Sequence, residues 1–160
     1  MLKKQSDAVL ILPDIRSTYN VGAIFRTADA VGVAKIYLVG ITPAPLDRFG
    51  RVRSDIAKSA LGAEQTVPWE QCARIAPLIT RLKKVGYTIV AIEQSARSVD
   101  YKKVRVSGPT AFILGNEVTG IPQSVLAKSD IIAEIPMQGM KESLNVSVAT
   151  GIALFRMLGQ

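Results

Sequence analysis

Two polar residues near the N-terminus lie in a segment whose residue types could do chemistry. The pattern N-x-G-x-x-x-R-T stands at Asn20, Gly22, Arg26 and Thr27, after an apolar run that stops at Pro13. Asn20 could simply cap a helix, because its side-chain oxygen can accept a hydrogen bond from a free amide of the first turn. Arg26 lies among apolar helix residues, where a guanidinium is costly unless it reaches a carboxylate, a phosphate or solvent. The segment therefore indicates an anion-binding arginine, with an ordinary surface arginine as the alternative.

A second candidate segment, G-N-E-x-x-G-I, follows a wholly apolar strand. It contains Gly115, Asn116, Glu117 and Gly120, and Pro122 begins a short helix after it. Glycines beside an amide and a carboxylate at a strand end let the backbone approach a ligand closely. The segment matches neither the G-x-x-x-x-G-K-[ST] phosphate loop nor the G-x-G-x-x-G fingerprint. A nucleoside triphosphate or a dinucleotide is therefore disfavoured as its ligand.

A third segment, at 135–147, combines a strand end, a glycine loop and the start of a helix. Ser143 is a natural N-terminal cap for that helix. Asn145 is a poor interior helix former and suits a cap or a ligand contact better. Met137 and Met140 either fill the core or offer an apolar surface to a flat ligand.

The elements that must position these segments alternate along the chain. Apolar runs predict strands at 8–12, 35–40, 87–93, 110–115 and 131–136, with an edge-like extension at 66–69 that holds Pro68. Helical periodicity predicts helices at 20–31, 54–61, 70–85 and 144–158. This alternation is typical of an α/β domain with a mainly parallel sheet and helices on both faces. Ligands of such sheets bind beyond the carboxyl ends of the strands, where all three segments lie.

The charge balance indicates a basic globular domain. The 160 residues carry 20 Lys and Arg against 13 Asp and Glu, a net charge of +7, and 48% of them are hydrophobic. Two basic stretches suit a polyanion, although a solvated surface explains them equally well. They are Arg48, Arg51, Arg53 and Lys58, and Arg97, Lys102, Lys103 and Arg105. No apolar run approaches the about 20 residues that cross a bilayer, so we expect a cytoplasmic protein without a membrane anchor.

The chain has no histidine and a single cysteine, Cys72. This excludes a Ser-His-Asp triad, a Cys-His dyad and an imidazole base, so chemistry must use other side chains or a cofactor. Cys72 falls in the predicted helix 70–85, and we interpret it as a buried structural thiol. The acids are scattered, so we expect no metal site.

Together, and in this order, the three segments resemble the three motifs of the SpoU (TrmH-like) family of SPOUT methyltransferases. The third segment matches I-P-M-x-G-x-x-x-S-L-N-V-[AS]-x-A over Ile135–Ala149, and the likeness runs from about Leu10 to the C-terminus. The resemblance implies a SPOUT-type domain with a deep C-terminal trefoil knot, which binds S-adenosylmethionine and works as a homodimer. It also implies that residues 1–160 form one methyltransferase domain without an appended RNA-binding domain.

The resemblance also implies roles for individual residues. Arg26 is the matched catalytic arginine, with Asn20 beside it and Glu117 and Asn145 helping to assemble the site. The residues implied to contact the cofactor are Ala91, Glu93, Leu114, Gly115, Glu117, Ile135, Pro136, Met137, Ser143, Leu144 and Asn145. The residues implied to bind RNA are Arg48, Arg51, Arg53 and Lys58.

The implied reaction is methyl transfer to a ribose 2′-hydroxyl, with tRNA favoured over rRNA as the substrate. Arg26 is either the base or a cation that clamps the neighbouring phosphate, because a guanidinium with a pKa above about 12 resists losing its proton. The alternatives are methylation of another RNA atom, a non-catalytic RNA-binding protein of the same fold and a generic nucleotide-binding protein. Ser17, Thr18 and Tyr19 either touch RNA or cap the helix.

Overall fold

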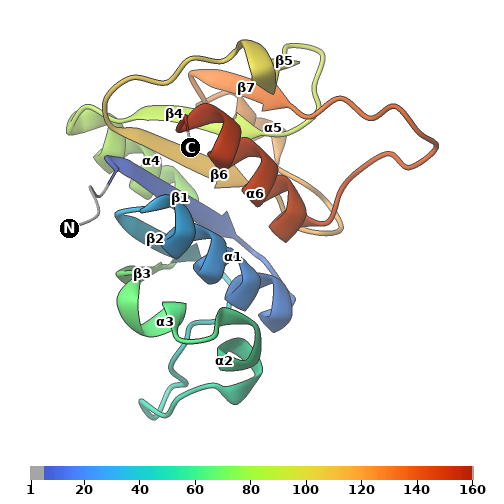
Figure 1. The fold of residues 1–160 in the computed structure, drawn as a ribbon. Helices are drawn as coiled ribbons and strands as arrows, with labels where there is room; N and C mark the ends of the chain where they lie inside the picture. Colours follow the sequence, from blue (N-terminus) through green and yellow to red (C-terminus); the bar gives the residue numbers. More distant parts are fainter. Residues whose placement is uncertain (1–5, 160) are drawn as a thin grey trace.

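The computed structural model describes residues 6–159, in which seven strands form one sheet (Figure 1). The strands are β1 (Ala8–Pro13), β2 (Lys35–Val39), β3 (Trp69–Cys72), β4 (Thr88–Ile92), β5 (Val99–Asp100), β6 (Thr110–Leu114) and β7 (Ile131–Glu134). The α-helices are α1 (Thr18–Val31), α2 (Ser54–Ala60), α3 (Ala63–Thr66), α4 (Ile75–Lys84), α5 (Gln123–Leu126) and α6 (Val146–Met157). The strand order is β3-β2-β1-β6-β4-β7-β5, and every neighbouring pair is parallel.

Alternate residues of each strand fill two separate cores. In β1, Leu10 and Leu12 pack with residues of α1 and α6, whereas Val9 and Ile11 pack with residues of α4. Figure 1 shows α1 and α6 side by side on one face of the sheet and α4 on the other. Strands buried on both faces read as continuous apolar runs, which is why they could be predicted. The predicted parallel sheet with helices on both faces is confirmed.

The predicted helix at 70–85 is wrong at its N-terminal end. Trp69–Cys72 form β3, which pairs with β2 at the edge of the sheet, and α4 begins only at Ile75. Of the edge-like extension predicted at 66–69, only Trp69 lies in a strand, which is at the edge of the sheet, whereas Thr66 ends α3. Cys72 is consequently half-buried on a strand rather than buried in a helix.

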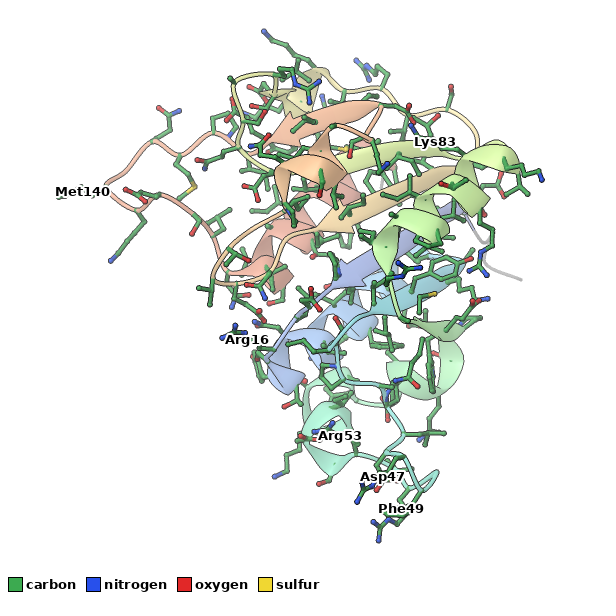
Figure 2. All side chains as sticks on the ribbon, turned by 180° about the vertical axis from the view of Figure 1, so that it is seen from behind. Arg16, Asp47, Phe49, Arg53, Lys83 and Met140 are labelled. Atoms are coloured by element: carbon green, nitrogen blue, oxygen red, sulfur yellow. The ribbon has the colours of Figure 1, made fainter. Side chains whose placement is uncertain are left out.

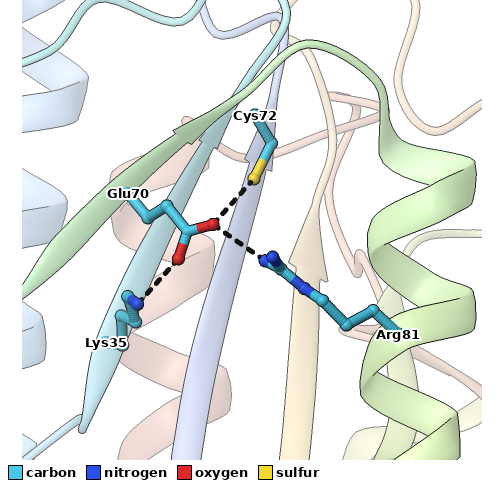
Figure 3. A network of polar contacts seen from close by, with 4 residues as sticks. All are labelled: Lys35, Glu70, Cys72 and Arg81. Atoms are coloured by element: carbon cyan, nitrogen blue, oxygen red, sulfur yellow. Dashed lines mark hydrogen bonds and ion pairs between the residues drawn. The ribbon is translucent and has the colours of Figure 1, made fainter.

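A polar network fixes β3 between β2 and α4 (Figure 3). The Glu70 carboxylate accepts hydrogen bonds from Lys35 Nζ at 2.7 Å and from Arg81 Nη2 at 2.9 Å. The Cys72 sulfur lies 3.8 Å from Glu70 Oε1. Burial, with the Glu70 charge next in size, raises the pKa of the Cys72 thiol. The thiol therefore stays protonated near neutral pH and acts as a packing group.

Three short elements were not predicted. They are α3, β5 and the 3₁₀ turn Tyr101–Lys103, each of four residues or fewer. Such segments are too short to show a hydrophobic period.

In the part of the chain that the structure describes, no helix is both long enough and apolar enough to cross a membrane.

Candidate active site

Glu117 lies where the loop after β6 meets the N-terminus of α1. Its carboxylate accepts hydrogen bonds from the amides of Arg16 at 3.1 Å and Ser17 at 3.2 Å, and from the Asn20 side chain at 3.2 Å. Burial acts to raise the pKa of Glu117, but these hydrogen bonds outweigh it and hold the pKa below its ordinary value. An anion is favoured there because the first amides of a helix lack partners and its dipole is positive at that end. Glu117 is thus an ionised anchor for the start of α1.

Asn20 joins Glu117 to the segment before α6. Asn20 is buried, and its side-chain oxygen accepts a hydrogen bond from Asn145 Nδ2 at 3.1 Å. The side-chain oxygen of Asn145 accepts from the amides of Ser147 at 2.9 Å and Val148 at 3.4 Å. One chain of hydrogen bonds, which we call the Glu117–Asn20–Asn145 cluster, therefore connects residues from all three sequence motifs.

Two helix caps expected from residue type are wrong, whereas Asn145, which also suited a cap, is confirmed as one. Ser143 does not cap the last helix, since α6 begins at Val146 and Asn145 is its N-cap. Asn20 does not cap the first helix either, because α1 begins at Thr18 and the Ser17 hydroxyl accepts the Asn20 amide at 3.1 Å. Ser17 is therefore the cap, which leaves the Asn20 side chain free for the cluster.

A cavity of about 660 Å³ opens beside the cluster, beyond the carboxyl ends of β4, β6 and β7. Its volume falls within the about 300–1,000 Å³ of typical small-molecule sites. Most residues expected to contact the cofactor line it: Glu93, Leu114, Gly115, Glu117, Ile135, Met137, Ser143, Leu144 and Asn145. Ala91 does not, because it is fully buried in the core under α4. Pro136 is exposed outside the lining.

Sequence reasoning missed Gln94 as a cavity residue. Its side chain donates a 2.8 Å hydrogen bond to the carbonyl oxygen of Glu142, and so ties the loop after β4 to the loop before α6. Gln94 directly follows Glu93 just beyond the end of β4, and this position could have marked it as a residue of the site.

The loop at 115–121 is held against the cavity by two side chains. Asn116 donates to the carbonyl oxygen of Asp14 and accepts from the Val118 amide at 2.7 Å. The Glu93 carboxylate accepts from the Ile121 amide at 2.9 Å. Gly120 has a φ of +68°, and a Cβ built there would lie 2.4 Å from Glu93 Oε2. Only glycine permits this close approach, so the loop shape depends on Gly120.

Arg26 is not part of the cluster. It lies on α1 about 1.7 turns beyond Asn20 and therefore on another face of the helix. Its side chain is exposed and makes no hydrogen bond or ion pair with other residues among 6–159. The guanidinium is thus available to an external anion.

Among residues 6–159, no three His, Cys, Asp or Glu side chains gather into a possible metal site.

The residues expected to bind RNA divide into two groups. Arg51 Nε lies 3.0 Å from Asp47 Oδ2, and Arg53 Nη2 lies 2.9 Å from Asp55 Oδ2. Arg48 and Lys58 are exposed and form no ion pair within the described part of the chain. Arg48 and Lys58 are therefore the uncompensated cations of this stretch.

Comparison with known proteins decides the family. Residues 7–155 match the model of the SpoU rRNA Methylase family. The chain belongs to the SpoU family. This confirms the membership predicted from the three motifs, and in the SpoU-family fold the second and third motifs line one cavity while Asn20 of the first motif is hydrogen-bonded to both.

Relatives of this SpoU-family chain act on two kinds of RNA, by their names. It is 36% identical over 155 residues to tRNA (guanosine(18)-2'-O)-methyltransferase of Escherichia coli, a match that covers 97% of this chain and 64% of that protein. It is 33% identical over 152 residues to the 23S rRNA (guanosine-2'-O-)-methyltransferase RlmB of Ralstonia nicotianae, covering 95% of this chain and 58% of that one. The chain therefore spans less than two thirds of the length of these relatives.

A solved structure of an rRNA methyltransferase has the same fold as this SpoU-family chain. The AdoMet-bound rRNA methyltransferase from Sinorhizobium meliloti superimposes with a TM-score of 0.85 and 31% identity, over 98% of this chain and 57% of that one.

Proposed function

We propose that this chain transfers a methyl group from S-adenosylmethionine to a ribose 2′-hydroxyl of RNA. The observation that carries the proposal is the Glu117–Asn20–Asn145 cluster, in which all three motifs meet and of which Glu117 and Asn145 line one cavity. The two relatives named above are both guanosine 2′-O-methyltransferases, which supports this reaction. We favour tRNA as the substrate and place rRNA second. The surroundings are expected to be cytoplasmic.

The residues of the cavity fit S-adenosylmethionine. Apolar surface for a purine comes from Ile92, Leu114 and Ile135. The loops that follow β4, β6 and β7 bring main-chain donors and acceptors to the opening of the cavity. The AdoMet-bound relative supports the same cofactor. When bound, S-adenosylmethionine supplies a methyl group on a positively charged sulfur. The protein then has to orient the hydroxyl and assist the loss of its proton, and we assign this assistance to Arg26, as base or as phosphate clamp.

We also propose that the active form is a homodimer with a basic RNA-binding surface. Three apolar side chains on α1 and α6 are exposed in the single chain: Tyr19 at 67%, Val148 at 49% and Phe155 at 44%. A second copy packed on α1 and α6 would bury them. Arg48, Arg51, Arg53 and Lys58 would contact the RNA backbone. The trefoil knot implied by the resemblance stays a prediction.

The test is titration of the purified protein with S-adenosylmethionine in a calorimeter, followed by methyl transfer from labelled cofactor. Total small RNA and ribosomal RNA serve as separate substrates, and nuclease digestion locates the label. The proposal predicts cofactor binding and label in 2′-O-methylnucleosides, with more label in small RNA. RNA binding without any cofactor binding would instead identify a non-catalytic RNA-binding protein.

A further inference from the structure

Phe49 is exposed at the tip of a short hairpin between β2 and α2. We call residues 46–52 the tip hairpin, because Leu46 and Val52 pair in antiparallel fashion at its base. Phe49 is 66% exposed, and Figure 2 shows it at the far end of this protruding segment, beyond Asp47. A single exposed apolar side chain is common on protein surfaces, so the exposure of Phe49 gains its meaning from the charged groups that surround it.

The tip hairpin is held in one conformation by Asp47. The Asp47 carboxylate accepts hydrogen bonds from the amides of Phe49 at 2.8 Å and Arg51 at 2.9 Å, and from Arg51 Nε at 3.0 Å. The Arg51 amide is the largest cause that lowers the pKa of Asp47, so the carboxylate stays ionised at neutral pH. Because the tip is ordered in advance, a ligand loses little free energy in ordering it.

Two guanidinium groups lie against the Phe49 ring. The centre of the Arg48 guanidinium is 4.8 Å from the ring centroid, and that of Arg51 is 4.9 Å from it. Both are within the about 6 Å of a cation–π contact. Aromatic rings and guanidinium planes are the surfaces on which proteins stack unpaired bases. We call Arg48, Phe49 and Arg51 the tip stack.

The tip hairpin connects through α2 to α1, the helix that carries Asn20. The hairpin leads into α2, where the Ser59 hydroxyl donates a 2.9 Å hydrogen bond to the carbonyl oxygen of Tyr19. A Cβ built on Gly22 would lie 2.0 Å from Ser59 Oγ, so α1 and α2 meet as closely as their backbones allow. The hairpin also follows the carboxyl end of β2, so it extends from the same edge of the sheet as the Glu117–Asn20–Asn145 cluster.

We propose that the tip stack is a binding platform for an unpaired base of the RNA substrate, beside the nucleotide that is methylated. The inference rests on the proposed function, because it takes RNA as the ligand. Arg48 carries an uncompensated charge within the described residues, and a phosphate next to the stacked base would satisfy it. The ligand class is therefore a single-stranded or looped RNA segment, recognised by its base face and its backbone.

The test compares Phe49→Ala, Phe49→Tyr and a matched control, Val85→Ala, in the full chain. Val85 is also 66% exposed but lies at the end of α4, away from the hairpin. Fluorescence anisotropy measures binding of a labelled RNA hairpin with an unpaired loop and of a fully paired duplex, between 50 and 200 mM salt. Phe49→Ala should weaken binding of the looped RNA about 5- to 100-fold and leave duplex binding unchanged. Phe49→Tyr and Val85→Ala should bind both RNAs like the wild type.

The salt dependence separates stacking from charge. Phe49→Ala should leave the slope of log K against log salt unchanged, whereas Arg48→Ala should reduce it by about 1. Wild-type-like binding of looped RNA by Phe49→Ala would overturn the inference, as would an equal loss for duplex. A change of oligomeric state in Phe49→Ala without RNA would overturn it too, since the ring would then belong to a protein interface.

The same experiments distinguish failure of the proposed function from failure of the binding platform. A wild-type protein that binds looped RNA through Phe49 but transfers no methyl group would contradict the enzyme and keep the platform. A wild-type protein that transfers methyl groups while Phe49→Ala binds looped RNA normally would keep the enzyme and contradict the platform.

Discussion

The side-chain amide of Asn145 donates a 3.1 Å hydrogen bond to the side-chain oxygen of Asn20, which lies 125 positions earlier in the chain. The side-chain nitrogen of Asn20, Nδ2, donates in turn to Glu117 Oε1. A single buried amide group is therefore the link between the start of α6 and the loop after β6. Each of its two polar atoms has a separate partner, so its removal leaves both neighbours without their bond.

Removal of the Asn20 side chain should cost stability. Asn20→Ala leaves the Asn145 amide and the Glu117 carboxylate without this partner, and an unsatisfied polar group costs about 1–3 kcal/mol. Urea unfolding should show a midpoint lower than that of the control Gln65→Ala, which changes an exposed residue on α3. Asn20→Asp should be destabilised at pH 7, because it sets a second carboxylate against Glu117. Equal midpoints for Asn20→Ala and Gln65→Ala would show that these bonds contribute nothing.

The Glu117 carboxylate should make stability depend on pH. Its pKa in the folded protein is below its ordinary value of 4.5, so its contribution is complete above that pH. It is lost as pH falls further, through the folded pKa. The free energy of unfolding of wild type should therefore fall more steeply below pH 4.5 than that of Glu117→Gln. The other carboxylates are the same in both proteins, and parallel curves would contradict the anchoring role of Glu117.

Gly120→Ala should damage the cavity more than it damages the fold. Gly120 and Gly86 both have positive φ, at +68° and +96°, so an alanine at either is strained by about 1–2 kcal/mol. Only at Gly120 does the new Cβ meet Glu93, because nothing lies within 4 Å of a Cβ at Gly86. Gly120→Ala should lose at least about tenfold in S-adenosylmethionine affinity by calorimetry, whereas Gly86→Ala should keep it. Similar affinities for the two variants would show that the loop tolerates the displacement of Glu93.

Arg26→Lys should show whether methyl transfer depends on the positive charge at this position or on the planar guanidinium. Lysine retains the positive charge but loses the planar fork that grips a phosphate. Since Arg26 is exposed and unpaired within residues 6–159, the melting temperature and cofactor affinity should not change. Methyl transfer should fall at least about 100-fold, the usual effect of removing a base or a transition-state donor. Near-normal transfer at pH 7.5 would contradict both roles of Arg26.

The buried strands could be predicted because both their faces are apolar, as in Val9, Leu10, Ile11 and Leu12. β3 could not, because its edge position leaves polar Glu70 among its residues, and the helical period of α4 extends backward over it. Its conformation comes from pairing with β2, which no local pattern shows.

The sequence predicted residues of the site but not which of them contact one another. The motifs placed Asn20, Glu117 and Asn145 at strand ends, yet the bond between Asn20 and Glu117 spans 97 positions. Ser143 and Asn145 both suit an N-cap by type, and the pairing of Asn145 with Asn20 distinguishes them. Tertiary partners of this kind lie outside what hydrophobic periodicity can show.

The position of β6 sets an order of assembly during synthesis. β6 lies between β1 and β4 in the sheet, so β1–β2–β3 and β4 have no shared hydrogen bonds until residues 110–114 have left the ribosome. Until then the nascent chain exposes the backbone edge of β1, which is a template for wrong pairing with other chains. Pairing β1 with β6 also closes a loop of about 100 residues, which slows folding. The arrival of β6 therefore joins β4 to the three strands β1–β2–β3, and β5 joins the sheet only when β7 follows.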